Sequence, residues 1–494
     1  MKFCTKPRSS AEFTMVKENS ILKNTSFLMA GTFLQRVLSL FTTVIITRFL
    51  GPEHYGQLTF IIALVTIVSV FWDFGLNTLF VRDVSRDKDL SAEYSGNVIA
   101  LKAFLLLLVF PVMLIYLKLL DYSEIIVISA ICFASGQFIS TITGIFESVF
   151  SAWKRLDYSA ILNVLRAAVL LALVIVVVKY STGLLGIVLC YSISFLVVFL
   201  IALILLKHSF VLPSFRGVKF RTLWNLIVRA SPFLLTSVVS IILFKIDHLM
   251  ISKITGDVEL GLYGAAYTLL EIIISFFPMI IMRSTFPVLC EMYHKDIDAM
   301  ASLFNKLFRI LLFFGLPISC GTFLLGTEFM SVIFGKDYTQ AGPLLSVLGG
   351  SVCVFFLTHL MGWTITAMDR QKLVLTFGVV SMVVNICINL IFIPLWGALG
   401  AAIATLLSEM VQLLCMGTLL WKTIHLRFNL WQFKTLISAG VMSLVIIFMK
   451  QVVFVNDIIK LLCMLAAAVV TYLLLSSIFK VISYNEMKNV LRSW

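Results

Sequence analysis

The sequence has few charged residues, and this scarcity decides the class of protein. Charged side chains make up 13% of the 494 residues, whereas hydrophobic residues make up 60%. Soluble domains are about a quarter charged and about half apolar, so this composition excludes an ordinary soluble protein. The apolar runs are close to the ~20 residues that a helix needs to cross a bilayer, and longer than the ~10-residue alternating segments of an outer-membrane barrel. We therefore predict an all-α, polytopic membrane protein.

Motifs for catalysis and metal binding are also lacking. The nine cysteines include no Cys-x-x-Cys pair, and the sequence has no nucleotide-binding glycine loop, nucleophile elbow or cluster of metal-ligand residues. The Asp-x-Asp match from Asp87 to Asp89 lies in a charge-rich turn, and we interpret it as a solvated loop. A membrane glycosyltransferase, polymerase or ligase needs catalytic groups in a sizeable outward loop, and the predicted loops are too short for this. We expect no enzyme, no cofactor and no metal site.

A continuous basic surface is missing as well, although the net charge is +13. Lys and Arg are scattered singly through short connections, so we expect no nucleic-acid partner. Alternate connections contain 24 and 6 of these residues, with the N-terminus in the richer set. By the positive-inside rule, this bias predicts that both termini are cytoplasmic. The apolar windows predict about 14 transmembrane helices, near 25–49, 58–80, 98–117, 124–150, 160–178, 184–206, 226–251, 264–286, 306–326, 343–367, 373–394, 398–421, 435–454 and 458–480.

Two glycine turns indicate an internal repeat. Each follows a predicted helix, and Gly51 and Gly56 of LGPEHYGQL precede Gly256 and Gly261 of TGDVELGLY by 205 residues. An even number of predicted helices lies between them, so the repeats are parallel. We predict two pseudo-symmetric six-helix bundles around a central cavity, the plan of an alternating-access transporter. The expected divisions are a cytoplasmic segment (1–24), two bundles (25–206 and 226–421) joined by a linker (207–225), and two additional helices (435–480).

The chain resembles a known family at three places. The resemblance rests on NTSFLMAGTFLQRVLSLFTTVIITRFLGPEHYGQLTF, DFGLNTLFVRDVSR and FKIDHLMISKITGDVELGLYGAAY. These resemble the polysaccharide biosynthesis membrane proteins, the O-antigen and capsule repeat-unit flippases of the multidrug/oligosaccharidyl-lipid/polysaccharide exporter superfamily. The resemblance implies movement of an undecaprenyl-diphosphate-linked oligosaccharide from the cytoplasmic to the outer leaflet of the bacterial inner membrane. It also implies the lipid bilayer and other polysaccharide-assembly membrane proteins as partners, and it does not identify the sugar.

Basic residues inside the predicted helices are candidates for the substrate pathway, because a charge at the bilayer centre costs about 2.5 to 3.5 kcal/mol. Arg36 lies about 16 Å into the first predicted helix, which is deep for snorkelling. Lys245 corresponds in the repeat to a position one turn from Arg36, and Arg283 lies in predicted helix 8. We expect these three cations to bind the diphosphate. The alternatives are a structural partner for Arg36 and an interfacial position for Lys245 beside Asp247. We interpret three other basic residues as snorkelling side chains: Lys102, Arg166 and Arg309.

Acidic and amide residues inside the predicted helices suggest two further roles. The candidates for coupling transport to H⁺ or Na⁺ are Asp73, Glu147, Asp247 and Glu271. Each can equally neutralise a neighbouring cation. The candidates for contacts with the glycan are Asn385, Asn389 and Gln412. The two asparagines share one helix face, and the alternative for all three is a hydrogen bond that holds helices together.

Two other transport functions are alternatives. A lipid II flippase shares the plan of fourteen helices and a cationic cavity, whereas a cation-coupled multidrug exporter is expected to have twelve helices and an acidic cavity. The first apolar run is too long for a cleaved signal peptide, so we expect the first helix to be retained. Translation starts at either Met1 or Met15, since a complete start also follows Met15.

Overall fold

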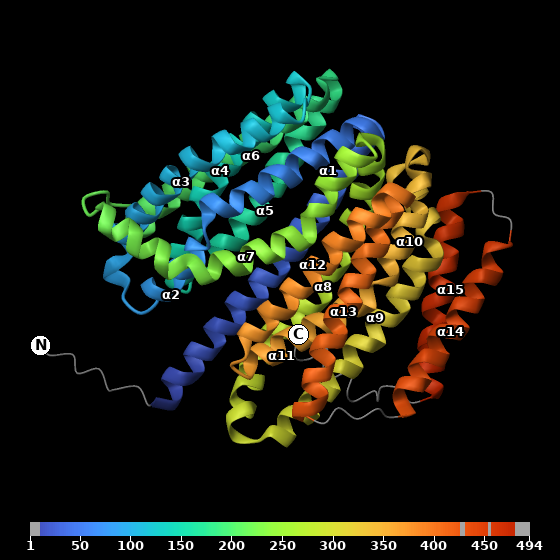
Figure 1. Cartoon of the computed structure of the whole chain (residues 1–494). Coiled ribbons are helices and arrows are strands. Elements are labelled where there is room, and N and C mark those ends of the chain that lie inside the picture. Colours follow the sequence, from blue (N-terminus) through green and yellow to red (C-terminus); the bar gives the residue numbers. More distant parts are fainter. Residues whose placement is uncertain (1–9, 425–429, 453–455, 480–494) are drawn as a thin grey trace, which may run out of the picture.

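The computed structural model of the chain describes residues 10–424, 430–452 and 456–479 (Figure 1). The side chains of residues 10–29 and of Arg283, among others, lie outside the described part, as do residues 1–9 of the predicted segment 1–24. In the described ranges the chain forms helices and no strand, which confirms the all-α prediction. Helices are favoured because a helix satisfies its own backbone hydrogen bonds in lipid.

The helices follow one another with short connections. The first part of the chain contains α1 (Ser10–Asp73), α2 (Leu76–Val84), η1 (Lys88–Leu90), α3 (Ser91–Leu119), α4 (Glu124–Ala152), α5 (Leu156–Tyr180) and α6 (Gly183–Ser209). The second part contains α7 (Phe220–Ile254), α8 (Asp257–Lys295), α9 (Ile297–Phe334), η2 (Lys336–Ala341), α10 (Gly342–Gly350), α11 (Val352–Ala367), α12 (Gln371–Trp396), α13 (Ala398–Ile424), α14 (Leu430–Lys450) and α15 (Asp457–Ile478). Among the described residues, 13 helical segments are long and apolar enough to cross a membrane.

The first of these segments accounts for two predicted helices. It runs over 44 residues, from Ala30 to Asp73, and would be about 66 Å long if straight, twice the thickness of the hydrocarbon core. α1 bends instead at Gly51, whose φ of 68° and ψ of 174° lie outside the helical region. Glycine adopts such angles at little cost. Counted as two crossings, α1 brings the described spans to the predicted fourteen.

A break between α1 and α2 was not predicted. Phe74 and Gly75 have φ values of 55° and 68°, so the predicted helix over 58–80 is wrong at this point. Gly75 packs closely on α7: a Cβ atom added to Gly75 would lie 2.6 Å from Cβ of Phe233 and 2.9 Å from its carbonyl carbon. Only glycine therefore fits at this contact without a shift of α7.

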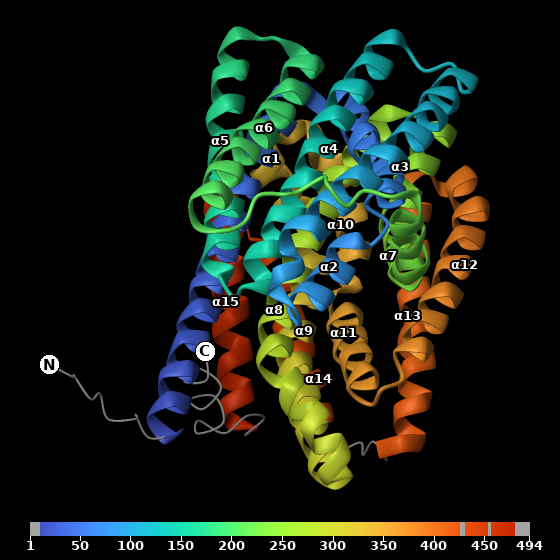
Figure 2. The same ribbon diagram turned by 90° about the vertical axis from the view of Figure 1, so that its left-hand side faces the viewer.

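The helices form two groups that approach each other at one end (Figure 1), and in Figure 2 the first group lies in front of the second. One group contains α1 to α6 and the other α8 to α13, with α14 and α15 packed on the second group against α9. We call the end that carries the turns at Gly51, Gly256 and Gly335 the glycine end. The opposite end carries the connections 85–90, 210–219 and 368–370, and we call it the basic end. This arrangement confirms the predicted plan of two pseudo-symmetric bundles with two additional helices.

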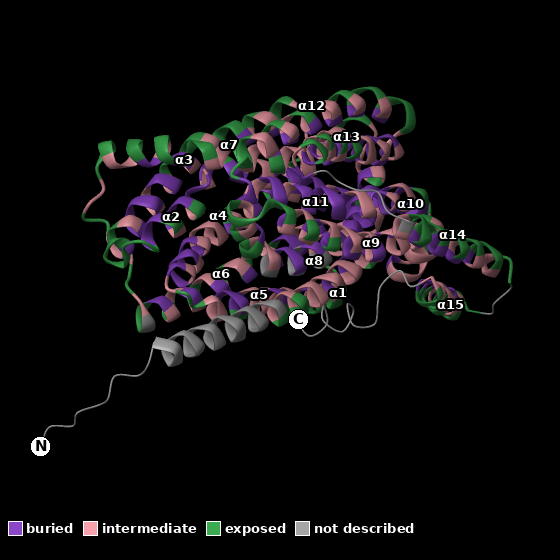
Figure 3. Ribbon diagram, turned by 90° about the horizontal axis from the view of Figure 1, so that it is seen from below, coloured by how far each residue is buried: buried purple, intermediate pink, exposed green. Residues whose placement is uncertain are grey.

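α7 contacts both groups, since it packs on α1, α2 and α3 and also on α12 and α13. Buried residues concentrate in the helices at the centre of the molecule, and exposed residues cover the peripheral helices (Figure 3). Exposed leucines and isoleucines are abundant on the outer helices, as lipid contact requires. A polar site is therefore expected at the centre, between the two groups.

Candidate functional site

A cavity of about 220 Å³ lies between the two groups of helices. α1, α6, α7 and α8 line it, so both halves of the internal repeat contribute. Arg36 of α1 and Lys245 of α7 both face this cavity, as the repeat predicted. The other polar lining residues are Ser39, Thr43, Tyr55, Thr59, Tyr191, His248, Tyr267, Thr268 and Glu271.

Arg36 is a half-buried cation in this cavity. Among the described residues it has no ion-pair or hydrogen-bond partner. A guanidinium group presents five N–H donors in a fixed plane and matches the oxygens of a phosphate. The structure therefore leaves its donors available to an anion that enters the cavity.

Lys245 forms an ion pair with Glu271 of α8, with 2.7 Å between Nζ and Oε1. Its Nζ also lies 5.2 Å from the ring centroid of Tyr267. The lysine and glutamate side chains are 19% and 38% exposed, so solvent in the cavity reaches both. The sequence suggested Asp247 as the neighbour of Lys245, but residues two positions apart on a helix point to different faces. The pair joins a predicted substrate cation to a predicted coupling carboxylate.

Asp247 lies in a separate buried network behind the cavity. Its carboxylate accepts hydrogen bonds from the backbone N–H of His248 (2.9 Å) and from the hydroxyl of Tyr263, and it lies 2.7 Å from Nδ1 of His248. The hydroxyl of Tyr263 lies 3.5 Å from Oγ1 of Thr405 in α13. Since His248 also lines the cavity, this network connects the cavity wall to the core of the second bundle.

The three predicted glycan contacts lie away from the cavity lining. Asn385 and Asn389 are buried and bond to each other through Nδ2 of Asn389 and Oδ1 of Asn385 (2.9 Å), and Asn385 also donates to Oγ of Ser408. Gln412 lies one helix further on, and its Oε1 is buried. In this conformation the asparagines hold α12 and α13 together, which was the alternative interpretation. Oδ1 of Asn389 and Oε1 of Gln412 have no hydrogen-bond partner among the described residues.

Asp73 and Lys102 form a second ion pair inside the first bundle. Nζ of Lys102 lies 2.6 Å from Oδ1 of Asp73 and 2.8 Å from Oδ1 of Asn77. Lys102 is completely buried, so the snorkelling interpretation is wrong for this residue. The pairing gives Asp73 a structural partner at the break between α1 and α2.

The remaining predicted site residues have different surroundings. Glu147 is half-buried in α4, outside the cavity lining, and Arg166 bonds to Asn163. The side chain of Arg283 lies outside the described part of the structure. The Asp87 carboxylate accepts a hydrogen bond from the backbone of Asp89 and caps η1, as expected of a loop. Within the described ranges no three His, Cys, Asp or Glu side chains lie together as a metal site.

The cavity is closed at the glycine end by contacts between the halves. A Cβ atom on Gly56 would overlap the carbonyl of Asp257, and one on Gly261 would overlap the carbonyl of Pro52, so α1 and α8 touch through their backbones. Arg48 of α1 donates to the carbonyls of Val332 and Ile333 at the end of α9 (2.8 and 2.9 Å). The hydroxyl of Tyr338 donates to the carbonyl of Thr47 (3.1 Å).

Sequence reasoning missed the aromatic lining of the cavity. Tyr55, Tyr191 and Tyr267 face it. Tyr191 lies in an ordinary apolar run, whereas Tyr55 and Tyr267 lie in the segments with the glycine turns, where they indicated the family and not a cavity. Their signal lay in helical spacing: Tyr55 and Thr59 are four residues apart, as are Tyr267 and Glu271, and such pairs share a helix face.

A cavity between two pseudo-symmetric helix bundles, with basic side chains and no catalytic constellation in the described part, is the architecture of a multi-pass membrane transporter. Residues 21–293 match the model of the polysaccharide biosynthesis protein family, which is more than half of the chain. The chain therefore belongs to this family, within the multidrug/oligosaccharidyl-lipid/polysaccharide exporter superfamily. Residues 221–474 also match the model of the lipid II flippase MurJ.

Relatives with similar sequences have names that concern glycans. The chain is 24% identical over 454 residues to the "Probable low-salt glycan biosynthesis flippase Agl15" of Haloferax volcanii, covering 90% of this chain and 93% of the relative. It is 21% identical over 413 residues to the "Capsular polysaccharide biosynthesis protein CapF" of Staphylococcus aureus, covering 80% and 98% of the two chains.

Solved structures confirm the fold. A lipid II flippase MurJ in an inward closed conformation superposes with a TM-score of 0.76 at 18% identity, over 92% of this chain and 98% of that one. An inward-facing multidrug resistance transporter of the MATE family superposes with a TM-score of 0.64 at 16% identity, over 79% and 96% of the two chains. At such identities the likeness concerns the fold alone.

Proposed function

We propose that this protein is a flippase that moves an undecaprenyl-diphosphate-linked oligosaccharide, an O-antigen or other surface polysaccharide repeat unit, from the cytoplasmic to the outer leaflet of the inner membrane. The basic end is then cytoplasmic, as the distribution of Lys and Arg indicates. The names of the relatives support a glycan-containing molecule as the transported substrate, and its transport needs no catalytic group. The protein is then no enzyme, and its substrate changes leaflet without a covalent step.

The presence of Arg36 in the central cavity is the observation that carries the proposal. Arg36 and Lys245 come from opposite halves of the repeat and line one space, while the glycine end of that space is closed. A diphosphate carries about two negative charges and several acceptor oxygens, and a guanidinium group binds such oxygens in pairs. Rocking of the bundles about the cavity would then expose the bound diphosphate first to the basic end and then to the glycine end.

The ion pair of Lys245 and Glu271 suggests how transport is coupled to protons. While Glu271 is ionised, it neutralises Lys245 at 2.7 Å. Protonation of Glu271 would release the charge of Lys245 for the diphosphate, so proton and substrate would each favour binding of the other. The other ionisable groups that line the cavity are Arg36, His248 and the tyrosines Tyr55, Tyr191 and Tyr267. Na⁺ is the alternative coupling ion, with the buried Asp247 as its candidate carboxylate.

Complementation of a deletion strain tests the transport function. Cells that lack the gene are labelled with a radioactive sugar precursor, and the leaflet in which the lipid-linked oligosaccharide accumulates is determined. We expect accumulation in the cytoplasmic leaflet, rescue by the intact gene and no rescue by Arg36→Ala at equal protein level. Arg86→Ala removes an exposed cation at the basic end and should rescue fully. Normal export in the deletion strain, or accumulation in the outer leaflet, would contradict the assignment as a flippase.

Binding measurements with the purified protein test the coupling. We expect undecaprenyl diphosphate to bind more tightly to Glu271→Gln than to the wild type, because the uncharged amide leaves the charge of Lys245 available to the diphosphate. If Glu271→Gln binds no more tightly than the wild type, this ion pair does not control the site and another group carries the proton. A dependence on Na⁺ that Asp247→Asn abolishes would assign the coupling to Na⁺ instead.

A lipid II flippase is the second candidate, favoured by the match of residues 221–474 to the MurJ model. Lipid II also carries a diphosphate, so the cavity alone does not separate the two functions. Cells depleted of their lipid II flippase provide the test. Growth restored by this gene would favour lipid II, whereas restored surface polysaccharide in the deletion strain alone would favour the repeat unit.

A further inference from the structure

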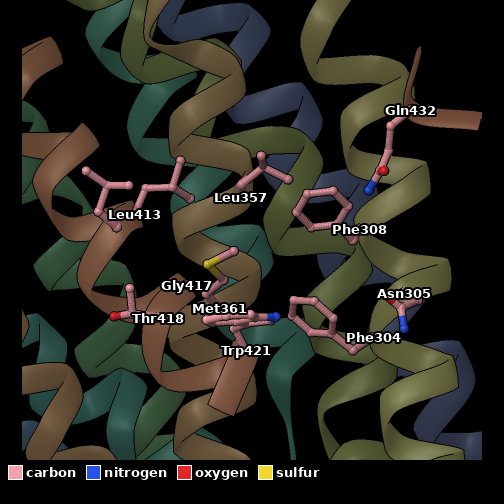
Figure 4. A pocket seen from close by; sticks show the side chains of 11 residues that line it. Phe304, Asn305, Phe308, Leu357, Met361, Leu413, Gly417, Thr418, Trp421 and Gln432 are labelled. Carbon is pink, nitrogen blue, oxygen red and sulfur yellow. The ribbon is translucent and has the colours of Figure 1, made fainter. Parts of the chain in front are cut away.

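A second cavity lies inside the second group of helices, outside the central site. It has a volume of about 360 Å³ and lies between α9, α11, α13 and the start of α14. One wall carries Phe304 and Phe308 of α9, and the facing wall carries Leu413, Thr418 and Trp421 of α13 (Figure 4). Met361 of α11 lies between the two walls (Figure 4).

This cavity opens toward lipid and has an apolar interior. Leu414 and Trp421 at its edge are 66% and 60% exposed, whereas Phe304 and Met361 in its depth are buried. No acidic residue is among the residues that line it. Such a space excludes water and ions but accepts a hydrocarbon chain from the surrounding bilayer.

Basic residues surround the cavity at the basic end of the molecule. Lys422 follows Trp421 and lies one helical turn beyond Thr418, on the same face of α13. On the facing wall, Lys306 follows Asn305, and Arg309 lies one turn beyond Asn305. Both lysines are exposed.

The position of Arg309 is fixed by aromatic rings that border the cavity. Its guanidinium lies 5.8 Å from the ring centroid of Trp431, and that ring lies 6.4 Å from the ring of Phe308, which lines the cavity. Gln432, the residue after Trp431, lines the cavity as well. Cationic groups therefore stand on both sides of an apolar space, at the end where helices meet the headgroup region.

We propose that this cavity binds an anionic phospholipid of the leaflet at the basic end, with one acyl chain between α9 and α13 and the headgroup phosphate at Lys306, Arg309 and Lys422. The positive charge of these three residues, the rim of the cavity, selects an anionic over a zwitterionic headgroup. The aromatic interior holds the acyl chain. Basic pockets between transmembrane helices are suited to anionic headgroups, and each Lys or Arg adds about fivefold in affinity. The lipid would connect α13 to α9 and α14 at this end. The site is independent of the transported substrate.

Gly417 offers a variant that fills the cavity. Gly417 lines it, and a Cβ atom there would meet only Cε and Sδ of Met361, at 3.9 and 4.0 Å, which is ordinary contact. Gly417→Leu therefore places a side chain in the space of the acyl chain without a clash at Cβ, and leucine favours the helix more than glycine does. Gly440→Leu is the matched control, because Gly440 lies on the exposed face of α14 with open space around it.

Native mass spectrometry of the full-length protein tests the site, with equal amounts of phosphatidylglycerol and phosphatidylcholine of the same acyl chains. We expect one retained phosphatidylglycerol per chain, at least about fivefold over phosphatidylcholine. Gly417→Leu should lose this lipid, and Gly440→Leu should keep it. Lys422→Gln should lower the preference about fivefold, and Lys336→Gln at the glycine end should not change it.

Three results would overturn the proposal. Equal retention of the two lipids would show that the rim does not select charge. Retention of phosphatidylglycerol by Gly417→Leu at the wild-type level would place the bound lipid elsewhere. A dimer of the chain that dissociates when Gly417 is replaced by leucine would identify the cavity as an interface between two copies of the protein.

Discussion

Gly56 and Gly261 occupy equivalent places in the two halves of the repeat and lie against each other's helix at the glycine end. A Cβ atom on either glycine would overlap a backbone carbonyl of the opposite half, that of Asp257 or of Pro52. The sequence repeat therefore marks the contact by which the bundles close on each other. A glycine at each position gives the backbones their close approach.

We predict that Gly56→Ala and Gly261→Ala open the glycine end. The added methyl group meets backbone, which cannot rotate away, and overpacking of this kind costs about 1 to 3 kcal/mol. Labelling of Tyr55→Cys in the cavity by a membrane-impermeant thiol reagent from outside the cell measures the opening, in a background without other cysteines. We expect faster labelling in both alanine variants. Gly321→Ala, where nothing lies within 4 Å of the new Cβ, is the control; an equal rise there would show a general loosening.

We predict that Lys102→Met destabilises the first bundle. The substitution leaves the carboxylate of Asp73 without its cation, and breaking a buried pair costs about 3 to 5 kcal/mol. Asp73 is 30% exposed, so solvent reduces the loss to about 2 kcal/mol. Thermal unfolding of the purified protein measures it, with Lys118→Met at an exposed site as control.

The double variant Lys102→Met with Asp73→Asn separates the ion pair from simple packing. It removes both charges, so part of the lost stability should return. If the stability lost in the double variant equals the sum of the losses in the two single variants, the two residues act independently and the ion pair contributes nothing.

We predict that the contact between α2 and α7 is insensitive to pH over the physiological range. Burial raises the pKa of Asp83, but hydrogen bonds from Tyr94 and Arg82 and the charge of Arg229 outweigh it, so the pKa lies below its usual value. A carboxylate with a lowered pKa contributes stability above its unfolded pKa of about 3.9, and this is lost as the pH falls through the folded value.

Asp83→Asn should therefore lower the melting temperature by a similar amount at every pH from 8 to about 5, with a difference that begins to shrink only near pH 4 and is lost as the pH falls further, through the folded pKa. Arg229 is 48% exposed, so the ion pair itself contributes about 0 to 1 kcal/mol. A difference that already changes between pH 8 and 6 would contradict this assignment and point to another titrating group.

The sequence predicted the helices well because lipid imposes a simple rule on them: length and apolar content decide which segments cross. It also predicted that Arg36 and Lys245 share a cavity, because the repeat relates their positions. Partners within the cavity were harder to predict. Glu271 is 26 residues from Lys245, and only the packing of α8 on α7 brings them together.

Depth along a helix was a poor guide to the surroundings of a side chain. Lys102 is close to an apparent membrane boundary, where a lysine normally reaches toward water, yet its helix face turns it inward to Asp73. The break at Phe74 and Gly75 left only a weak signal in the sequence, because a single glycine in an apolar run is common. No sequence feature indicated the apolar cavity, because its lining residues are of the same types as other lipid-facing or core residues.

The contact of Gly56 with Gly261 also bears on how far the helices can move, because a contact at one end of long helices acts as a pivot. α8 contains 39 residues and starts at this contact, so it extends about 58 Å from there. A tilt of about 10° at this pivot would move the far end of such a helix by about 10 Å. A small rotation between the two closely fitted glycines would therefore produce a wide opening at the other end of the helices.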